Sequence, residues 1–148
     1  MGPILGLRIR VLTAVAVLAA TGTASAANWV PAGESIGEDG VPRKFFIDKA
    51  SIVKKGAVRR VWLREEAEHP AAFTMPGQTS QFFRSSLVAF EYNCEHRETA
   101  TRAIQMFSEP NTQGQKVFSH TIPGNLEFSP VSPDSMGERW MKIACSPR

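Results

Sequence analysis

The residues of this sequence that are most able to do chemistry are two cysteines, Cys94 and Cys145, and three histidines. The histidines, His69, His96 and His120, are far apart, and none has the spacing to a partner that a metal site or a general base requires. Cys94 and His96 could supply two metal ligands, but a disulfide between the cysteines would remove the thiolate that a metal needs. We therefore expect no metal site and no cofactor.

Other groups that could support catalysis are few. The sequence contains no G-x-G-x-x-G and no P-loop, and beyond residue 26 it has only three aspartates, Asp39, Asp48 and Asp134. Asp48 lies in an apolar stretch and could be catalytic if burial raised its pKa. However, the sequence from Asp48 to Ser51 is typical of a turn in which a short acceptor side chain bonds backbone N–H groups. This structural role is the one that we expect, and we expect no enzyme.

The N-terminal segment has the three parts of a secretory signal peptide. Arg8 and Arg10 supply positive charge, residues 11–20 form an apolar stretch too short to span about 30 Å of hydrocarbon, and small residues end at Ala26. The alternative is a retained membrane anchor. We expect cleavage after Ala26, which leaves one domain of 122 residues, 27–148, with no membrane span. No cysteine follows the apolar stretch, so we do not expect lipidation.

Export sets the expectation for the two cysteines. Disulfides form and persist in oxidising compartments, and an even number of cysteines in an exported chain favours their pairing. Fifty residues lie between Cys94 and Cys145. We therefore predict a Cys94–Cys145 disulfide in a soluble periplasmic or extracellular protein.

Positive charge is concentrated in one short segment. The chain has a net charge of +3, and cleavage of the signal peptide would remove Arg8 and Arg10. The remaining domain has a net charge of +1, which is too small for the overall electrostatic field of a nucleic-acid binder. Residues 43–64 hold eight lysines and arginines against one aspartate. The predicted binding patch in this segment comprises Lys54, Lys55, Arg59, Arg60 and Trp62. Such a patch attracts anionic polysaccharides or acidic protein segments, or it protects an exposed sheet edge from aggregation.

The pattern of apolar residues predicts a meander of antiparallel strands. A hairpin is expected from residues 45–53 and 58–64, joined by a turn at 54–56, and further strands at 81–94, 99–107 and 116–122. Residues 67–80, rich in proline, glycine and polar side chains, are expected to form a loop. In the strand 81–94, Phe82, Val88, Phe90 and Tyr92 alternate with Ser85 and Glu91, which predicts one apolar and one polar face.

The last segment has the signals of a helix. Ser135 and Glu138 match a capping box, and Met136, Trp140 and Ile143 have helical spacing. We expect this C-terminal helix to pack on one face of the sheet, stapled by the disulfide. Cys145 points away from that apolar stripe at about 100° per residue, so either the helix ends before it or the buried face is wide.

With these residues laid out, the chain resembles the bacterial surface-adhesin protein E family over most of the part beyond residue 26. The likeness rests on the following residues: Trp29, Phe46-Ile47-Asp48, Ser51-Ile52, Gly56, Val61-Trp62, residues 90–94, Arg97, Arg102, residues 130–135 and residues 140–145. The resemblance implies an α+β fold, with about six antiparallel strands and a C-terminal helix held by a disulfide.

The resemblance also implies a non-enzymatic role in adhesion. Its best-known members bind host matrix and serum proteins, form dimers and carry a lipid anchor. This sequence departs from them in having no lipidation cysteine and in having Asn93 where an aspartate commonly precedes the first cysteine. Our main hypothesis is an exported adhesin-like module that binds host proteins or anionic polymers through the basic hairpin. The alternatives are a periplasmic accessory protein without a host ligand, or a hydrolase in which His96 or His120 meets a nucleophile.

Overall fold

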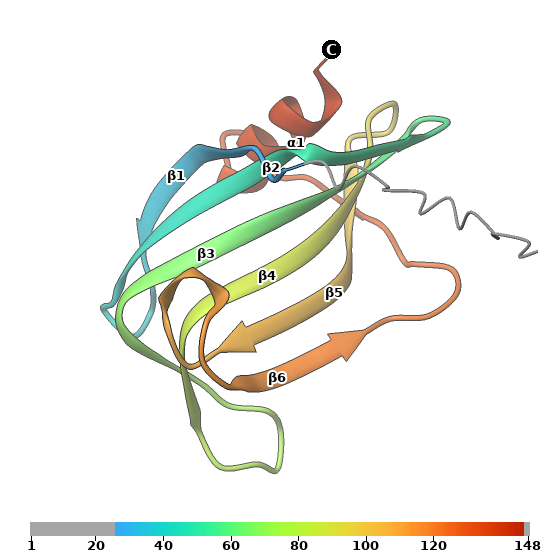
Figure 1. Cartoon of the computed structure of the whole chain (residues 1–148). Coiled ribbons are helices and arrows are strands. Elements are labelled where there is room, and N and C mark those ends of the chain that lie inside the picture. The colour runs from blue at the N-terminus through green and yellow to red at the C-terminus, as the bar shows by residue number, and fades with distance from the viewer. Residues whose placement is uncertain (1–25, 147–148) are drawn as a thin grey trace, which may run out of the picture.

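The computed structural model describes residues 26–146 and contains one antiparallel sheet with a C-terminal helix (Figure 1). The predicted signal peptide lies outside the described residues except for Ala26. The strands are β1 (Trp29–Ile36), β2 (Pro42–Lys55), β3 (Val58–Phe73), β4 (Gln81–Asn93), β5 (Glu98–Phe107), β6 (Lys116–Thr121) and β7 (Ser129–Pro130), and the helices are the 3₁₀ helix η1 (Pro110–Thr112) and α1 (Met136–Cys145).

The strands form the expected meander. Strands β1 to β6 lie side by side in sequence order, every pair antiparallel, and the short β7 pairs with β5. The five strands predicted from the residue pattern correspond to β2 to β6. The α+β fold, with six main strands and one C-terminal helix, is confirmed. Within the described residues, no helix is both long enough and apolar enough to cross a membrane.

Two features of the sheet differ from the residue pattern. The predicted loop at 67–80 is wrong in its first half, because β3 continues to Phe73 and only residues 74–80 form the loop. A register shift between Glu66 and Ala71 absorbs Pro70, and pairing with β4 then resumes. Strand β1 was not expected from the pattern, since Pro31 and Gly33 interrupt it. They lie at a register shift where Gly33 adopts φ 131°, which favours glycine.

The buried apolar residues form two clusters. The larger one lies between α1 and strands β1 to β4, and its buried members are Ala32, Ile47, Val61, Leu63, Tyr92, Val131, Met141 and Ala144. The smaller one contains buried Ala67, Ala71 and Phe83, near the β3–β4 loop. Phe73 packs edge-on against Phe83 and Phe118 in this second cluster, which explains why the chain stays in the sheet to residue 73.

Helix α1 begins after the capping residue Ser135 and runs to Cys145. The Ser135 side chain accepts a hydrogen bond from the backbone N–H of Glu138, as a capping residue should. The helix includes Cys145, and its buried face is wide, so the second of the two sequence alternatives is correct. Met141 and Ala144 are fully buried, while Trp140 and Ile143 are partly buried.

Three kinds of contact hold α1 on the sheet. The predicted disulfide joins Cys145 to Cys94 in the turn after β4. The Trp140 ring packs 5.2 Å from Phe45 and 5.8 Å from Phe90, measured between centroids, and its indole N–H donates to the Ala32 carbonyl at 3.0 Å. Buried Glu138 accepts a hydrogen bond from Arg97 in the same turn as Cys94. The helix is therefore fixed to β1, β2, β4 and the β4–β5 turn.

Removing the disulfide should destabilise the protein strongly. The bond closes a loop with a sequence separation of 51 residues. For such a loop, the chain-entropy model gives about 4 kcal/mol of stabilisation. We expect the variant Cys94→Ser/Cys145→Ser to lose about this much free energy of unfolding in urea. Wild-type protein reduced with dithiothreitol is the control and should show the same loss. An unchanged unfolding midpoint in both samples would show that the helix stays docked without the bond.

Acid should loosen the contact between α1 and the β4–β5 turn. The hydrogen bond from Arg97, followed by those from the Asp134 N–H and Lys142, lowers the pKa of Glu138 below its ordinary value of 4.5. A carboxyl whose pKa is lowered by folding adds stability above its unfolded pKa and loses it as the pH falls through its folded pKa. Glu138→Gln should therefore be less stable than wild type at pH 7. The difference should shrink below about pH 4.5, as urea unfolding at several pH values would show. A constant difference from pH 7 to pH 3 would contradict this role of Glu138.

Candidate binding surface

The face of the sheet opposite α1, here called the open face, is the candidate functional surface. Side chains directly opposite one another on paired strands lie on the same face. Trp29 pairs with Asp48, and Asp48 pairs with Trp62. These residues alternate with core residues such as Leu63, so both tryptophans lie on the open face. Within the described residues, the one α-helix covers the other face.

An arginine held between aromatic rings occupies the middle of the open face. The Arg64 guanidinium carbon lies 4.8 Å from the centroid of the Trp29 ring and 5.0 Å from that of Phe46. Its Nε lies 3.1 Å from a carboxylate oxygen of Glu66. Stacking and ion pairing restrict the guanidinium together. Arg64 therefore supports a rigid aromatic platform, and much of its charge is already neutralised.

The structure separates the predicted patch residues into two groups. Lys54 pairs with Arg59 across the hairpin, and both lie on the helix-bearing side. Lys55 and Arg60 lie on the open face. Arg60 is two residues before Trp62 along β3. The Arg59 guanidinium donates to the carbonyls of Gly56 and Val58 at 2.8 and 3.2 Å, so it braces the turn.

Fewer charges of the basic hairpin are available than its sequence indicates. Arg43 forms ion pairs with Asp39 at 2.8 Å and Glu65 at 3.0 Å, and Arg64 pairs with Glu66. Lys54, Lys55 and Arg60 are exposed and have no ion-pair partner among residues 26–146. These three cations lie together at the hairpin end, whereas the exposed Lys44 lies between Glu34 and Glu66 at the other end of the sheet.

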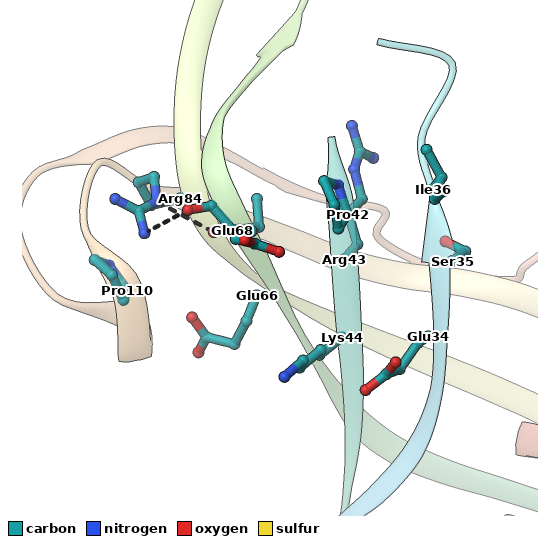
Figure 2. Close-up of a pocket in the computed structure, with 11 residues that line it drawn as sticks. Glu34, Ser35, Ile36, Pro42, Arg43, Lys44, Glu66, Glu68, Arg84 and Pro110 are labelled. Carbon is teal, nitrogen blue, oxygen red and sulfur yellow. Dashed lines mark hydrogen bonds between the residues drawn. The ribbon is translucent and has the colours of Figure 1, made fainter. Parts of the chain in front are cut away.

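The opposite end of the open face carries a groove of about 620 Å³, whose lining holds three glutamates and three cationic side chains (Figure 2). Glu34, Lys44 and Glu66 lie in one row across β1, β2 and β3, and their side chains point to the same side of the sheet. Arg84 donates to the carbonyls of Ala67 and Glu68, both at 3.1 Å. The open face therefore has a cationic end, an aromatic centre and an end where positive and negative charges balance.

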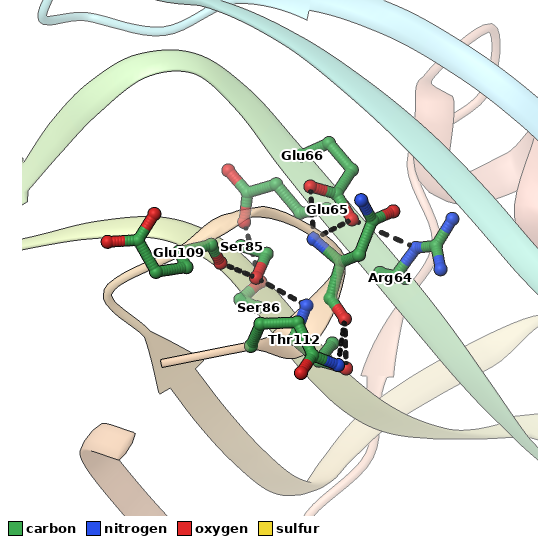
Figure 3. Close-up of polar contacts among 9 residues, drawn as sticks. Arg64, Glu65, Glu66, Ser85, Ser86, Glu109 and Thr112 are labelled. Carbon is green, nitrogen blue, oxygen red and sulfur yellow. Dashed lines mark hydrogen bonds and ion pairs between the residues drawn. The ribbon is translucent and has the colours of Figure 1, made fainter. Parts of the chain in front are cut away.

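The segment between β5 and β6 forms one wall of this groove and is held by buried polar contacts. It folds over β3 and β4 (Figure 1), and Ser85 and Glu66 bind its backbone (Figure 3). The Ser85 hydroxyl donates to the Glu109 carbonyl at 2.6 Å and accepts from the Thr112 N–H at 2.8 Å. Both carboxylate oxygens of Glu66 accept from the Asn111 N–H at 3.0 Å.

This segment explains where the expected alternation in β4 was wrong. Ser85, expected on a polar face, is fully buried beneath residues 109–112, whereas Phe82, expected with the apolar residues, is 59% exposed. The neighbouring Phe83 enters the second apolar cluster instead. A serine that binds backbone groups of a distant loop has no signature in its own strand.

The residues considered for catalysis have structural or exposed positions. Asp48 accepts from the backbone N–H groups of Asn28 at 2.7 Å and Ala50 at 3.0 Å, which confirms its turn role. His69, His96 and His120 are exposed. In the described part of the chain, no three side chains among histidine, cysteine, aspartate and glutamate are grouped as a metal would require. Burial raises the pKa of the Tyr92 hydroxyl, which therefore stays protonated at neutral pH.

One short match to a catalytic motif lies outside the required context. Residues 33–37 have the spacing G-x-S-x-G, which in hydrolases forms a sharp turn from a strand into a helix. Here Ser35 lies within the edge strand β1, paired with Arg43, and the chain turns into β2 rather than into a helix. The match therefore does not build a nucleophile elbow.

The sequence reasoning did not identify the aromatic platform. Trp29, Phe46 and Arg64 come from three strands, and only the pairing register brings them together. The one local signal is the alternation of Arg60, Trp62 and Arg64 along β3, which places all three on one face.

The fold and the open face define a small disulfide-stapled α+β domain with a charged and aromatic surface. A profile of the family described as Surface-adhesin protein E matches residues 29–146, and the chain belongs to this family.

Solved structures of Haemophilus influenzae protein E are similar in fold. Crystal form II has a TM-score of 0.50 and 15% sequence identity, and the match covers 68% of this chain and 79% of that chain. A selenomethionine form has the same TM-score and identity, with 78% of this chain and 88% of that chain covered. At this identity, the likeness shows a shared fold. No curated protein matches the chain.

Replacing Ser85 should release the groove wall. Ser85→Ala leaves the Glu109 carbonyl and the Thr112 N–H without their partner, which costs about 1–3 kcal/mol for buried groups. We expect that loss in urea unfolding, together with faster hydrogen exchange at the Thr112 amide. Ser119→Ala, at an exposed position of β6, is the matched control and should change stability by less than about 0.5 kcal/mol. Equal stability of the two variants, with unchanged exchange at Thr112, would contradict the role of Ser85.

Proposed function

We propose that this protein is an exported, non-enzymatic, adhesin-like module that binds an anionic polymer at the hairpin end of its open face. Membership of the surface-adhesin protein E family supports a surface role and export. The signal peptide expected to end at Ala26 also supports export, and the disulfide is compatible with an oxidising compartment outside the cytoplasm. A sulfated or phosphorylated polysaccharide is the ligand class that fits exposed, uncompensated cations.

The observation that carries this proposal is that Lys55 and Arg60 lie close together at the end of the face that also presents Trp62. The two cations have no ion-pair partner in residues 26–146, so binding an anion does not require breaking an existing pair. Trp62 is half-buried and anchored through its backbone N–H to the Ser51 hydroxyl at 3.0 Å. An indole on the same face as these exposed cations supplies a flat contact surface at little cost in conformational entropy.

The groups that catalysis would need do not converge on this face. Glu91 and Arg102 form an ion pair at 2.9 Å, and Oδ1 of Asp48 accepts hydrogen bonds from two backbone N–H groups. The exposed histidines lie in different parts of the fold: His69 in β3, His96 in the β4–β5 turn and His120 in β6. These positions support a binding role rather than a hydrolytic one.

Charge reversal on the open face should abolish binding to anionic polymers. Lys55→Glu/Arg60→Glu should weaken binding of the exported protein to heparin by at least about tenfold at low salt, because attraction turns into repulsion. Surface plasmon resonance over a series of salt concentrations measures the change.

The matched control makes the same change in net charge on the helix-bearing side. Lys54→Glu/Arg139→Glu alters two exposed cations there and should weaken heparin binding much less. Equal losses in both variants would show that only net charge matters. Wild-type protein that does not bind heparin even at low salt would also overturn the proposal.

A further inference from the structure

A pocket of about 410 Å³ opens at the hairpin end of the open face. Five strands or their adjoining segments contribute to its lining, which consists of Val53, Lys55, Val58, Arg60, Glu91, Arg102, Thr121, Ile122 and Pro123. Its volume lies within the range of small-molecule sites, about 300–1,000 Å³. The uncompensated cations of the proposed binding surface are therefore at the rim of a concavity rather than on a flat surface.

Arg102 fixes the far wall of this pocket. Its Nη1 donates to the carbonyls of Ile122 and Gly124, both at 2.8 Å, and its Nε donates to Glu91 at 2.9 Å. These bonds tie the segment that follows β6 to strands β4 and β5. The same bonds neutralise Glu91, the one acidic residue of the lining, so Lys55 and Arg60 supply the net positive charge.

The pocket also exposes aliphatic side chains beside these cations. Val53 is 51% exposed and Ile122 is 37% exposed, and they are two of the five large apolar residues most exposed in the described chain. They come from β2 and from the segment after β6, with Val58 and Pro123 completing the apolar lining. A purely polar polymer would bind the cations and leave this apolar surface in contact with water. A ligand that also covers the apolar surface gains affinity from its burial.

We propose that the pocket binds a small anionic amphiphile, with a phosphate or carboxylate head against Lys55 and Arg60 and an aliphatic tail against Val53 and Ile122. The proposal rests on the proposed function for the two cations and adds the apolar half of the ligand. Charge complementarity selects the head, because the net charge of the lining is positive.

Titration calorimetry of the exported protein with octyl phosphate tests the proposal below the concentration at which that compound forms micelles. We expect octyl phosphate to bind at least about tenfold more tightly than inorganic phosphate, which lacks the tail, or octyl glucoside, which lacks the charge. Octanoate is the second arm. Equal binding of octanoate indicates that the site accepts any anionic head, as in free fatty acids, whereas selective binding of octyl phosphate indicates a lipid phosphate. Equal affinity for octyl phosphate and inorganic phosphate would overturn the proposal.

Two variants separate this proposal from the proposed function. Val53→Ser/Ile122→Ser should weaken octyl phosphate binding by about tenfold and leave heparin binding unchanged, whereas Lys55→Glu/Arg60→Glu should weaken both. Ile36→Ser/Phe82→Ser, which changes two exposed apolar residues outside the pocket, is the matched control. Unchanged octyl phosphate affinity in Val53→Ser/Ile122→Ser overturns the pocket alone. Unchanged heparin affinity in Lys55→Glu/Arg60→Glu overturns the proposed function.

Discussion

The attachment of α1 to one face of the sheet is the constraint on which the rest of the structure depends. A ten-residue helix is marginal as an isolated element, so its stability comes from packing and from the Cys94–Cys145 bond. Trp140, between Phe45 and Phe90, and the Arg97–Glu138 contact fix its orientation. A helix of this length covers strands β1 to β4 on one side. The other side of the sheet is therefore the face on which aromatic and charged side chains remain accessible.

The pairing register determines what the open face presents. Because side chains alternate along β3, Glu65 lies on the helix-bearing side, where it pairs with Arg43, and Glu66 lies on the open face beside Arg64. The same alternation divides the hairpin cations between the two sides. A segment with eight positive charges in sequence thus presents two exposed cations without an ion-pair partner, Lys55 and Arg60, at the hairpin end of the open face. A shift of the register by one residue would exchange the two sets.

Local signals in the sequence predicted α1 and strands β2 to β6, and long-range contacts decided the remainder. The Ser135–Glu138 capping box and the alternation in residues 81–94 identified α1 and β4, because caps and periodicity act within one element. The extension of β3 to Phe73 depends on packing against Phe83 and Phe118, which lie in other strands. The burial of Ser85 depends on a loop more than twenty residues away. The Cys94–Cys145 bond was predictable because two cysteines allow one pairing, whereas the division of the basic patch needed the register.

The two charged ends of the open face are far enough apart to act independently. Arg60 and Glu66 are six residues apart along β3, which is about 20 Å at 3.3 Å per residue. The Debye length at physiological ionic strength is about 8 Å, so the glutamates of the groove do not cancel the field around Lys55 and Arg60. The aromatic platform between them is nearly neutral, because Arg64 is paired with Glu66 and stacked on Trp29 and Phe46. The proposed function therefore places an anionic ligand at a local cationic site on a protein whose net charge is small.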